Sequence, residues 1–305
     1  MSWAAHEFEN YFFQKHFGTK ASFLAICTGT YLPDVFTKHF VYQHQADAAQ
    51  FHRGWPGLGF THSLTYGFVV AVLILAVTKS RAWALGILIG QWAHVITDIS
   101  DTAGVMAFFP FSTDNLTIGM WKHAAAEGRG GDGAAYYSGL GGIWDFFWML
   151  MVLVFAREAL RADYFRRVVV PTDPKVWAFL GRRLYLNDNA LLVFYRGLFL
   201  YGVGRMIVWF IYARFQVRTP WQPVWGGPLY VPGNHLNHGS AWSIAGSLAI
   251  GAVAFALFVY LSWVLVVRRL WERAGACEAA SPNDTSREAL ETVDNAPRTE
   301  YHELA

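Results

Sequence analysis

The sequence predicts an all-α, polytopic membrane helix bundle of about six spans, with a polar, metal-type site at one membrane face. Composition and pattern both indicate this fold class. Hydrophobic residues make up 54% of the 305-residue chain, and charged residues only 15%. The mean hydropathy of +0.25 exceeds the value usual for a soluble domain of this length. The apolar residues also gather in long blocks, which is typical of an integral membrane protein.

These apolar blocks follow one another along the whole chain. They cover residues 21–33, 64–79, 82–98, 140–156, 189–213 and 241–267. The first is short enough to be a re-entrant helix, whereas three of the others are long enough to span a membrane without further argument.

Basic residues between the blocks predict the orientation of the bundle. They gather in the segments 78–81, 157–188 and 268–273. The positive-inside rule places these segments and both termini in the cytoplasm. The loops 34–63, 99–139 and 214–240 then face the outside of what we expect to be a bacterial cytoplasmic membrane.

The distribution of apolar and polar segments also predicts the domain organisation. Residues 1–273 are predicted as one integral membrane domain, and 274–305 as a disordered, acidic cytoplasmic tail with few large apolar residues. The first residues lack a basic stretch followed by an apolar core, so we expect no cleavable signal peptide.

Two further features of the sequence exclude particular kinds of site. The two cysteines exclude a disulfide framework and a cysteine-rich metal site. The glycine-rich stretch 127–142 lacks the Gly-Lys-Ser/Thr ending of a phosphate-binding loop, so we interpret it as a mobile lid or linker.

The most informative local feature is a polar stripe that closes the third apolar block. His94, Asp98 and Asp101 stand at i, i+4 and i+7, which places their side chains along one side of a helix. An imidazole and a carboxylate at i and i+4 can bind the same divalent metal ion. A hydrogen-bonded pair at a helix end is the alternative, and the spacing alone leaves both open.

Three further polar blocks precede the stripe, and the predicted topology brings all of them to the same membrane face. They are Pro33-Asp34, His52-Arg53-Gly54 and Thr61-His62-Ser63. Together with the stripe and the later Gly104 and Pro110-Phe111-Ser112, the series resembles the YdjM-type family. That family is described as LexA-binding and inner membrane-associated, and is classed among metal-dependent hydrolases. Its pattern reads Pro-Asp-x-Asp, His-Arg-Gly-x-Thr-His-Ser and His-x3-Asp, and the resemblance covers residues 25–120.

The segment from His94 to Asp98 is also similar to the signature of zinc-dependent phospholipases C and single-strand nucleases. This similarity implies a helical fold, several zinc ions and phosphodiester hydrolysis. The chain departs from both patterns, because Phe36 replaces the second aspartate, residues 55–60 are inserted, and no Pro-x-His follows the stripe. A family histidine near the N-terminus corresponds to either His6 or His16.

Taken with the resemblance, the residues predict a site for a divalent metal, zinc being expected, in one copy or more. The predicted ligands are Asp34, His52, His62, His94 and Asp98. The predicted catalytic residues are Asp98 and Arg53, whose guanidinium suits an anionic substrate group. The further candidates are His16, Asp101 and Asp145, of which Asp101 is favoured as an acceptor for a ligating histidine. Each of these residues also has an alternative role that needs no metal. Asp34 could be a turn or cap residue, His52 a solvated loop histidine, and Arg53 a contact to lipid headgroups at the interface.

Two arginines interrupt the fifth apolar block, where an unpaired charge is costly. Arg196 and Arg205 are nine residues apart and therefore lie on opposite helix faces. Pairing of one of them with Asp145 is the attractive hypothesis, and snorkelling to the interface is the alternative. His235 and His238 either complete the metal site or lie in a solvated loop.

Three functions compete at this point. The leading hypothesis is a membrane-bound hydrolase that uses a metal-activated water on a phosphoester or lipid-like substrate. The second is a membrane scaffold or regulatory protein with a structural metal or polar cluster. The third is a transporter that uses Asp145, Arg196 and Arg205. The expected partners are the lipid bilayer and a small-molecule or lipid substrate, with no nucleic acid, and the oligomeric state stays open.

Overall fold

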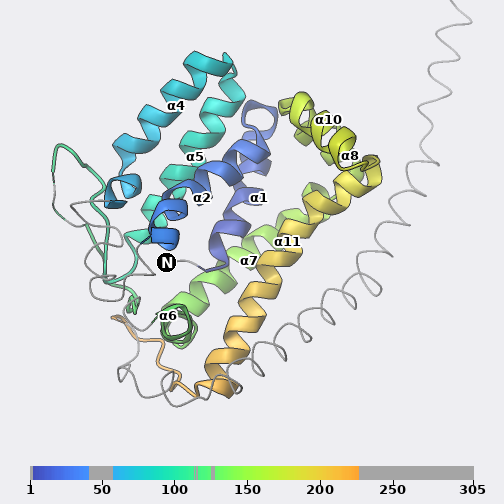
Figure 1. Ribbon diagram of the computed structural model, residues 1–305. Coiled ribbons are helices and arrows are strands. Elements are labelled where there is room, and N and C mark those ends of the chain that lie inside the picture. Colours follow the sequence, from blue (N-terminus) through green and yellow to red (C-terminus); the bar gives the residue numbers. More distant parts are fainter. Residues whose placement is uncertain (1–2, 41–57, 113, 115, 125–127, 227–305) are drawn as a thin grey trace, which may run out of the picture. The chain divides into compact units, whose positions relative to one another are not determined.

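The computed structural model describes residues 3–40, 58–112, 114, 116–124 and 128–226, and all regular elements in that part of the chain are helical (Figure 1). These residues belong to one compact unit. The longer helices are α1 (Ala5–Phe17), α2 (Phe23–Phe40), α4 (Leu64–Thr78), α5 (Arg81–Asp98), α6 (Gly128–Tyr137), α7 (Leu140–Ala159), α10 (Pro174–Arg183) and α11 (Asp188–Ile211). The short helices α8 (Ala162–Tyr164) and α9 (Val170–Thr172) lie between α7 and α10. The all-α prediction is confirmed for the described residues.

Two of these helices are long and apolar enough to cross a membrane. They are α7 and the continuous helix Asp188–Gln216, which consists of α11 and the π-helical turn η5 (Tyr212–Gln216). The apolar helix α4 is shorter. The predicted span 82–98 is α5, whose apolar run is interrupted by Gln91, His94 and Asp98, so it fails the same criterion. The segments 241–267 and 274–305 lie outside the described residues, and neither six spans nor the predicted orientation is confirmed.

Helix α1 is the element that connects the two sides of the described structure. It contacts α2 and α5 on one side and α7 and α11 on the other (Figure 1). The N-terminus of α1 is held by Asp145 of α7, which accepts hydrogen bonds from the backbone N–H groups of Ala4 at 2.9 Å and Ala5 at 2.8 Å. A carboxylate at this position both satisfies free backbone donors and complements the helix dipole.

Glycines bring α2 and α5 into backbone contact. A Cβ atom on Gly29 would lie 2.4 Å from the carbonyl oxygen of Ile87, and one on Gly90 would lie 2.2 Å from that of Ile26. No larger side chain fits at such distances, so these positions need glycine. Because the helices approach so closely, Asp34 near the middle of α2 comes within reach of His94, one turn beyond Gly90.

The glycine-rich stretch 127–142 is not a lid or linker where the structure describes it, so that prediction was wrong. Residues Gly128–Tyr137 form α6, and α7 begins at Leu140. The glycines make room for aromatic rings: a Cβ on Gly133 would lie 2.6 Å from the indole of Trp209, and one on Gly141 would lie 2.2 Å from the ring of Tyr136. Composition alone indicated flexibility, whereas the role of these glycines is close packing.

Candidate metal centre

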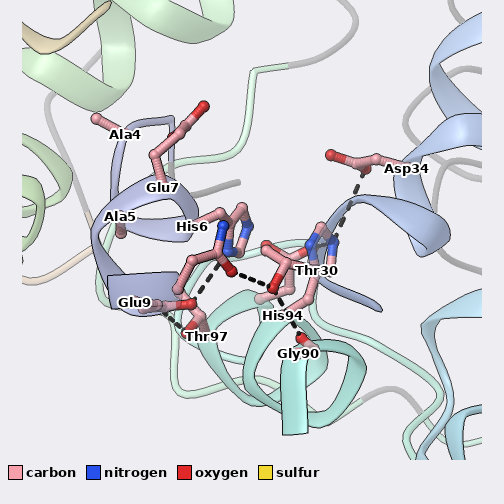
Figure 2. A network of polar contacts seen from close by, with 12 residues as sticks. Ala4, Ala5, His6, Glu7, Glu9, Thr30, Asp34, Gly90, His94 and Thr97 are labelled. Atoms are coloured by element: carbon pink, nitrogen blue, oxygen red, sulfur yellow. Dashed lines mark hydrogen bonds and ion pairs between the residues drawn. The ribbon is translucent and has the colours of Figure 1, made fainter. Parts of the chain in front are cut away.

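Imidazole and carboxylate side chains from four elements converge where α1, α2 and α5 meet. We call them the His/Asp cluster: His6 from α1, Asp34 from α2, His62 from the 3-10 turn η2 (Leu58–His62), and His94 and Asp98 from α5. All five residues are buried, with exposed fractions between 0% and 4%. Figure 2 shows His6 and His94 close together, with Asp34 approaching from the other side.

Three atoms of the cluster form a compact triangle. Nε2 of His94 lies 3.3 Å from Nε2 of His62 and 3.2 Å from Oδ2 of Asp98, and the third side is 3.6 Å. Two ligand atoms bound to one tetrahedral zinc ion at ~2.0–2.2 Å lie ~3.3–3.6 Å apart. The three atoms are therefore spaced as ligands of a single ion would be.

Asp34 extends this triangle. Its Oδ1 atom lies 3.6 Å from Nε2 of His62 and 3.9 Å from Nε2 of His94, so it offers a further oxygen to the same ion. His6 extends the cluster on the opposite side, because its ring stacks on that of His94 with centroids 4.2 Å apart. One donor atom each from His6, His94 and Asp98 lies within 4.8 Å of the others, so His94 and Asp98 belong to both halves of the cluster.

Neighbouring side chains fix the orientation of His62. Thr61 donates its hydroxyl hydrogen to the carbonyl oxygen of Pro33 at 3.0 Å, which leaves a lone pair to accept from Nδ1 of His62 at 3.3 Å. This arrangement favours the tautomer whose Nε2, the atom that faces the cluster, carries no hydrogen. Gln91 holds the same turn against α5 by donating to the backbone oxygens of Thr61 at 3.0 Å and Ser63 at 2.8 Å.

Glu9 plays the corresponding role at His6. Its Oε2 lies 3.3 Å from Nδ1 of His6, and its Oε1 accepts a hydrogen bond from the Thr97 hydroxyl at 2.8 Å (Figure 2). The other ring nitrogen of His6, Nε2, is buried and has no hydrogen-bond partner within the described structure. A metal ligand needs one nitrogen with a free lone pair and an acceptor at the other, and His6 meets both conditions. The sequence indicated neither Glu9 nor Thr97, although Glu9 stands three residues after His6.

Burial sets the protonation of these groups, which lie outside the two candidate spans. It lowers the pKa of His62 to about 4 and that of His6 well below its usual value. Both imidazoles are therefore neutral at pH 7, the form that binds metals. Burial also raises the pKa of Glu9 to about 8, so a charged Glu9 requires a nearby cation.

The other predicted site residues have different positions. His16 lies ten residues beyond His6 on α1, about 15 Å along the helix, and is exposed beside Phe12. Of the two N-terminal candidates, the structure therefore brings His6 and not His16 to the cluster.

The buried carboxylate of Asp101 accepts hydrogen bonds from the backbone N–H groups of Ala103 at 3.0 Å and Gly104 at 3.2 Å, so it shapes the turn after α5. Its contact with a ligating histidine stays a prediction, and His52, Arg53, His235 and His238 lie outside the described residues.

The predicted pairing of Asp145 with an arginine was wrong. Besides the two backbone groups of α1, Asp145 accepts from the hydroxyls of Tyr136, at 2.9 Å, and Tyr137. Arg205 instead pairs with Glu7 of α1, and Nε of Arg196 donates to the carbonyl oxygen of Leu160 at 2.6 Å. Asp145 and Arg205 are thus engaged in contacts that hold α1 in place.

A comparison with protein families finds a match over the first half of the chain. The model of the family described as YdjM inner membrane protein matches residues 4–162, just over half of the chain. The chain belongs to the YdjM inner membrane protein family. The YdjM match includes the whole His/Asp cluster, Glu9 and Asp145, whereas α10 and α11 lie beyond it. Membership and the two candidate spans support a membrane protein. Neither the curated proteins nor the solved structures contain a match to the chain.

Proposed function

We propose that this YdjM-family protein is a membrane-bound metal-dependent hydrolase that acts on a phosphoester or lipid-like substrate. The triangle formed by His62, His94 and Asp98 carries the proposal, because its sides match the ligand spacing of one zinc ion. The buried Nε2 of His6 also fits, because it has no hydrogen-bond partner among the residues that the structure describes, whereas a buried polar atom usually has one.

A bound divalent ion supplies Lewis acidity and lowers the pKa of a water molecule that it holds. His62, His94 and Asp98 would hold the ion, and Asp34 would either complete its ligand set or accept a proton from that water. Arg53 would bind the anionic group of the substrate. Location in a membrane favours a substrate that is itself a membrane component.

Chelation tests the hydrolase proposal directly. We expect the purified protein in detergent to hydrolyse bis(p-nitrophenyl) phosphate or p-nitrophenyl butyrate, which represent phosphodiesters and carboxylic esters. Activity should fall to background after chelation and in the Asp98→Asn variant, should return with added zinc, and should persist in His16→Gln. Turnover that resists chelation would contradict the proposal. A protein that holds stoichiometric zinc but hydrolyses neither compound would instead favour a structural metal in a scaffold protein.

Glu9 provides a second test that depends on the metal rather than on the substrate. We expect Glu9→Gln to weaken zinc binding about 10- to 100-fold, the range found when the partner of a ligating histidine is removed. Competition with a chromogenic chelator measures this affinity. The matched control is Glu158→Gln, because Glu158 is 61% exposed and pairs with Lys15 away from the cluster. Equal zinc affinity in both variants would show that Glu9 does not position His6.

A further inference from the structure

Basic side chains from several elements gather around the first turn of α5. The backbone N–H of Ser22 donates to the carbonyl oxygen of Ala82 at 3.0 Å, which brings the turn before α2 to this end of α5. The indole of Trp83 donates to the carboxylate of Asp173, which brings the segment 160–187 to the same end. We call the exposed basic residues of these elements the basic end face: Lys20, Arg81, Arg161, Lys175, Arg182 and Arg183.

The carboxylates of the surrounding segments do not neutralise the basic end face. Asp163 pairs with Arg167 at 2.7 Å, and Glu158 pairs with Lys15 at 2.5 Å. Asp173 is buried and so contributes no exposed negative charge. The basic end face therefore keeps an excess of positive charge.

The basic end face lies between the two candidate spans along the chain. The segment 160–187 connects α7 with the helix Asp188–Gln216, so a chain that crosses the membrane with both helices has this segment at one membrane face. His94 stands 13 residues after Arg81 on α5, about 20 Å along the helix. The basic end face is therefore separate from the His/Asp cluster.

Helix α10 turns one side toward the rest of the protein and the other side outward. Trp177 is buried and packs its ring against that of Phe165, with centroids 5.0 Å apart. Lys175, Phe179 and Arg182 stand at i, i+4 and i+7, which places them together on the opposite side of the helix. The outward side of α10 thus combines cations with an aromatic ring.

Exposed apolar side chains beside these cations indicate what kind of anionic partner fits. Phe179 is 52% exposed, and Leu184 and Tyr185, which directly follow Arg182 and Arg183, are 59% and 95% exposed. Basic residues interleaved with exposed aromatic and aliphatic ones are typical of a helix that lies in a membrane interface. A soluble polyanion would match the charge but would leave these apolar side chains in water.

We propose that the basic end face binds the anionic phospholipid headgroups of one membrane leaflet, with Phe179, Leu184 and Tyr185 entering the interfacial layer. Guanidinium groups bind phosphate oxygens in pairs, and the excess positive charge is attracted to the negative potential of an anionic leaflet. The apolar side chains are removed from water at the same surface. Lipid binding here does not rest on the proposed hydrolase function, because no residue of this face belongs to the His/Asp cluster.

Native mass spectrometry of the full-length protein in neutral detergent tests this proposal. The probes are phosphatidylglycerol, phosphatidylcholine and a soluble hexaglutamate peptide, each titrated separately to obtain an apparent Kd. Arg183→Glu reverses a charge on the basic end face, and Phe179→Ser removes an apolar contact. The matched control is Arg218→Glu, because Arg218 is also exposed but does not belong to this face. Circular dichroism confirms that each variant is folded.

We expect the wild-type protein to bind phosphatidylglycerol at least about tenfold more tightly than phosphatidylcholine, with a preference that shrinks as the ionic strength rises. Arg183→Glu should raise the Kd for phosphatidylglycerol about tenfold, whereas Arg218→Glu should leave it unchanged. Phe179→Ser should weaken the binding of phosphatidylglycerol but not that of hexaglutamate. Equal affinity for the two lipids, or an unchanged Kd in Arg183→Glu, would overturn the proposal. Tighter binding of hexaglutamate than of phosphatidylglycerol would also overturn it, because the face would then suit an acidic protein.

Discussion

Replacing Arg205 by methionine is expected to lower the free energy of unfolding by about 3–5 kcal/mol. Arg205 lies within the candidate span Asp188–Gln216 and pairs through Nη1 with Oε1 of Glu7, whose side chain is 1% exposed. Its guanidinium also lies over the rings of Trp3 and Tyr201, 5.6 Å from each centroid. Loss of the arginine leaves the carboxylate of Glu7 buried and uncompensated, which costs far more than the pair gains over an apolar substitute.

The double variant separates this effect from a general packing defect. Because apolar residues can replace a buried ion pair with little cost, Glu7→Met/Arg205→Met should recover most of the stability that either single change loses. Unfolding of the protein in detergent measures all three variants. The control is Lys15→Met, because its partner Glu158 is mostly exposed and the loss should stay below about 1 kcal/mol. Additive losses in the double variant would contradict the ion-pair account.

The Glu7–Arg205 pair matters for the His/Asp cluster because α1 carries Glu7 as well as His6. Glu7 contacts α11, while its neighbours His6 and Glu9 reach α5. Asp145 holds the first turn of the same helix. The candidate spans thus fix the position of α1, and α1 in turn brings the sixth residue of the chain to a centre formed mainly by α2 and α5.

The sequence contained enough information to find much of this centre. Asp34, His62, His94 and Asp98 stand in short polar blocks beside apolar segments, and their order matches the family pattern, so their proximity could be expected. The choice between His6 and His16 could not be made, because it depends on which turn of α1 faces α5. Glu9 and Gln91 escaped notice since their roles consist of single tertiary contacts that leave no spacing signal.

The predictions that were wrong or unconfirmed failed for the same physical reason, because they depend on tertiary contacts that leave no signal in the sequence. An apolar run predicted α5 as a span, yet its polar residues serve the cluster and lower its hydropathy. The cost of a charge in an apolar segment left pairing and snorkelling open for Arg205, and it does not say which carboxylate folds beside the arginine. Nor does the glycine content of 128–141 reveal that aromatic rings occupy the space these residues leave.

The metal content of the purified protein tests the central claim most directly. Protein from zinc-replete medium should contain about one or two zinc ions per chain by elemental analysis, because a tetrahedral ion needs three or four ligands and the cluster offers five. His94 contributes to both halves of the cluster, so His94→Ala should lose all of the metal. The milder His62→Gln should lose the ion of the half that contains His62, and His16→Ala should retain the full metal content. Circular dichroism confirms that each variant is folded. Wild-type protein without stoichiometric metal, or a folded His94→Ala variant that keeps it, would contradict the account.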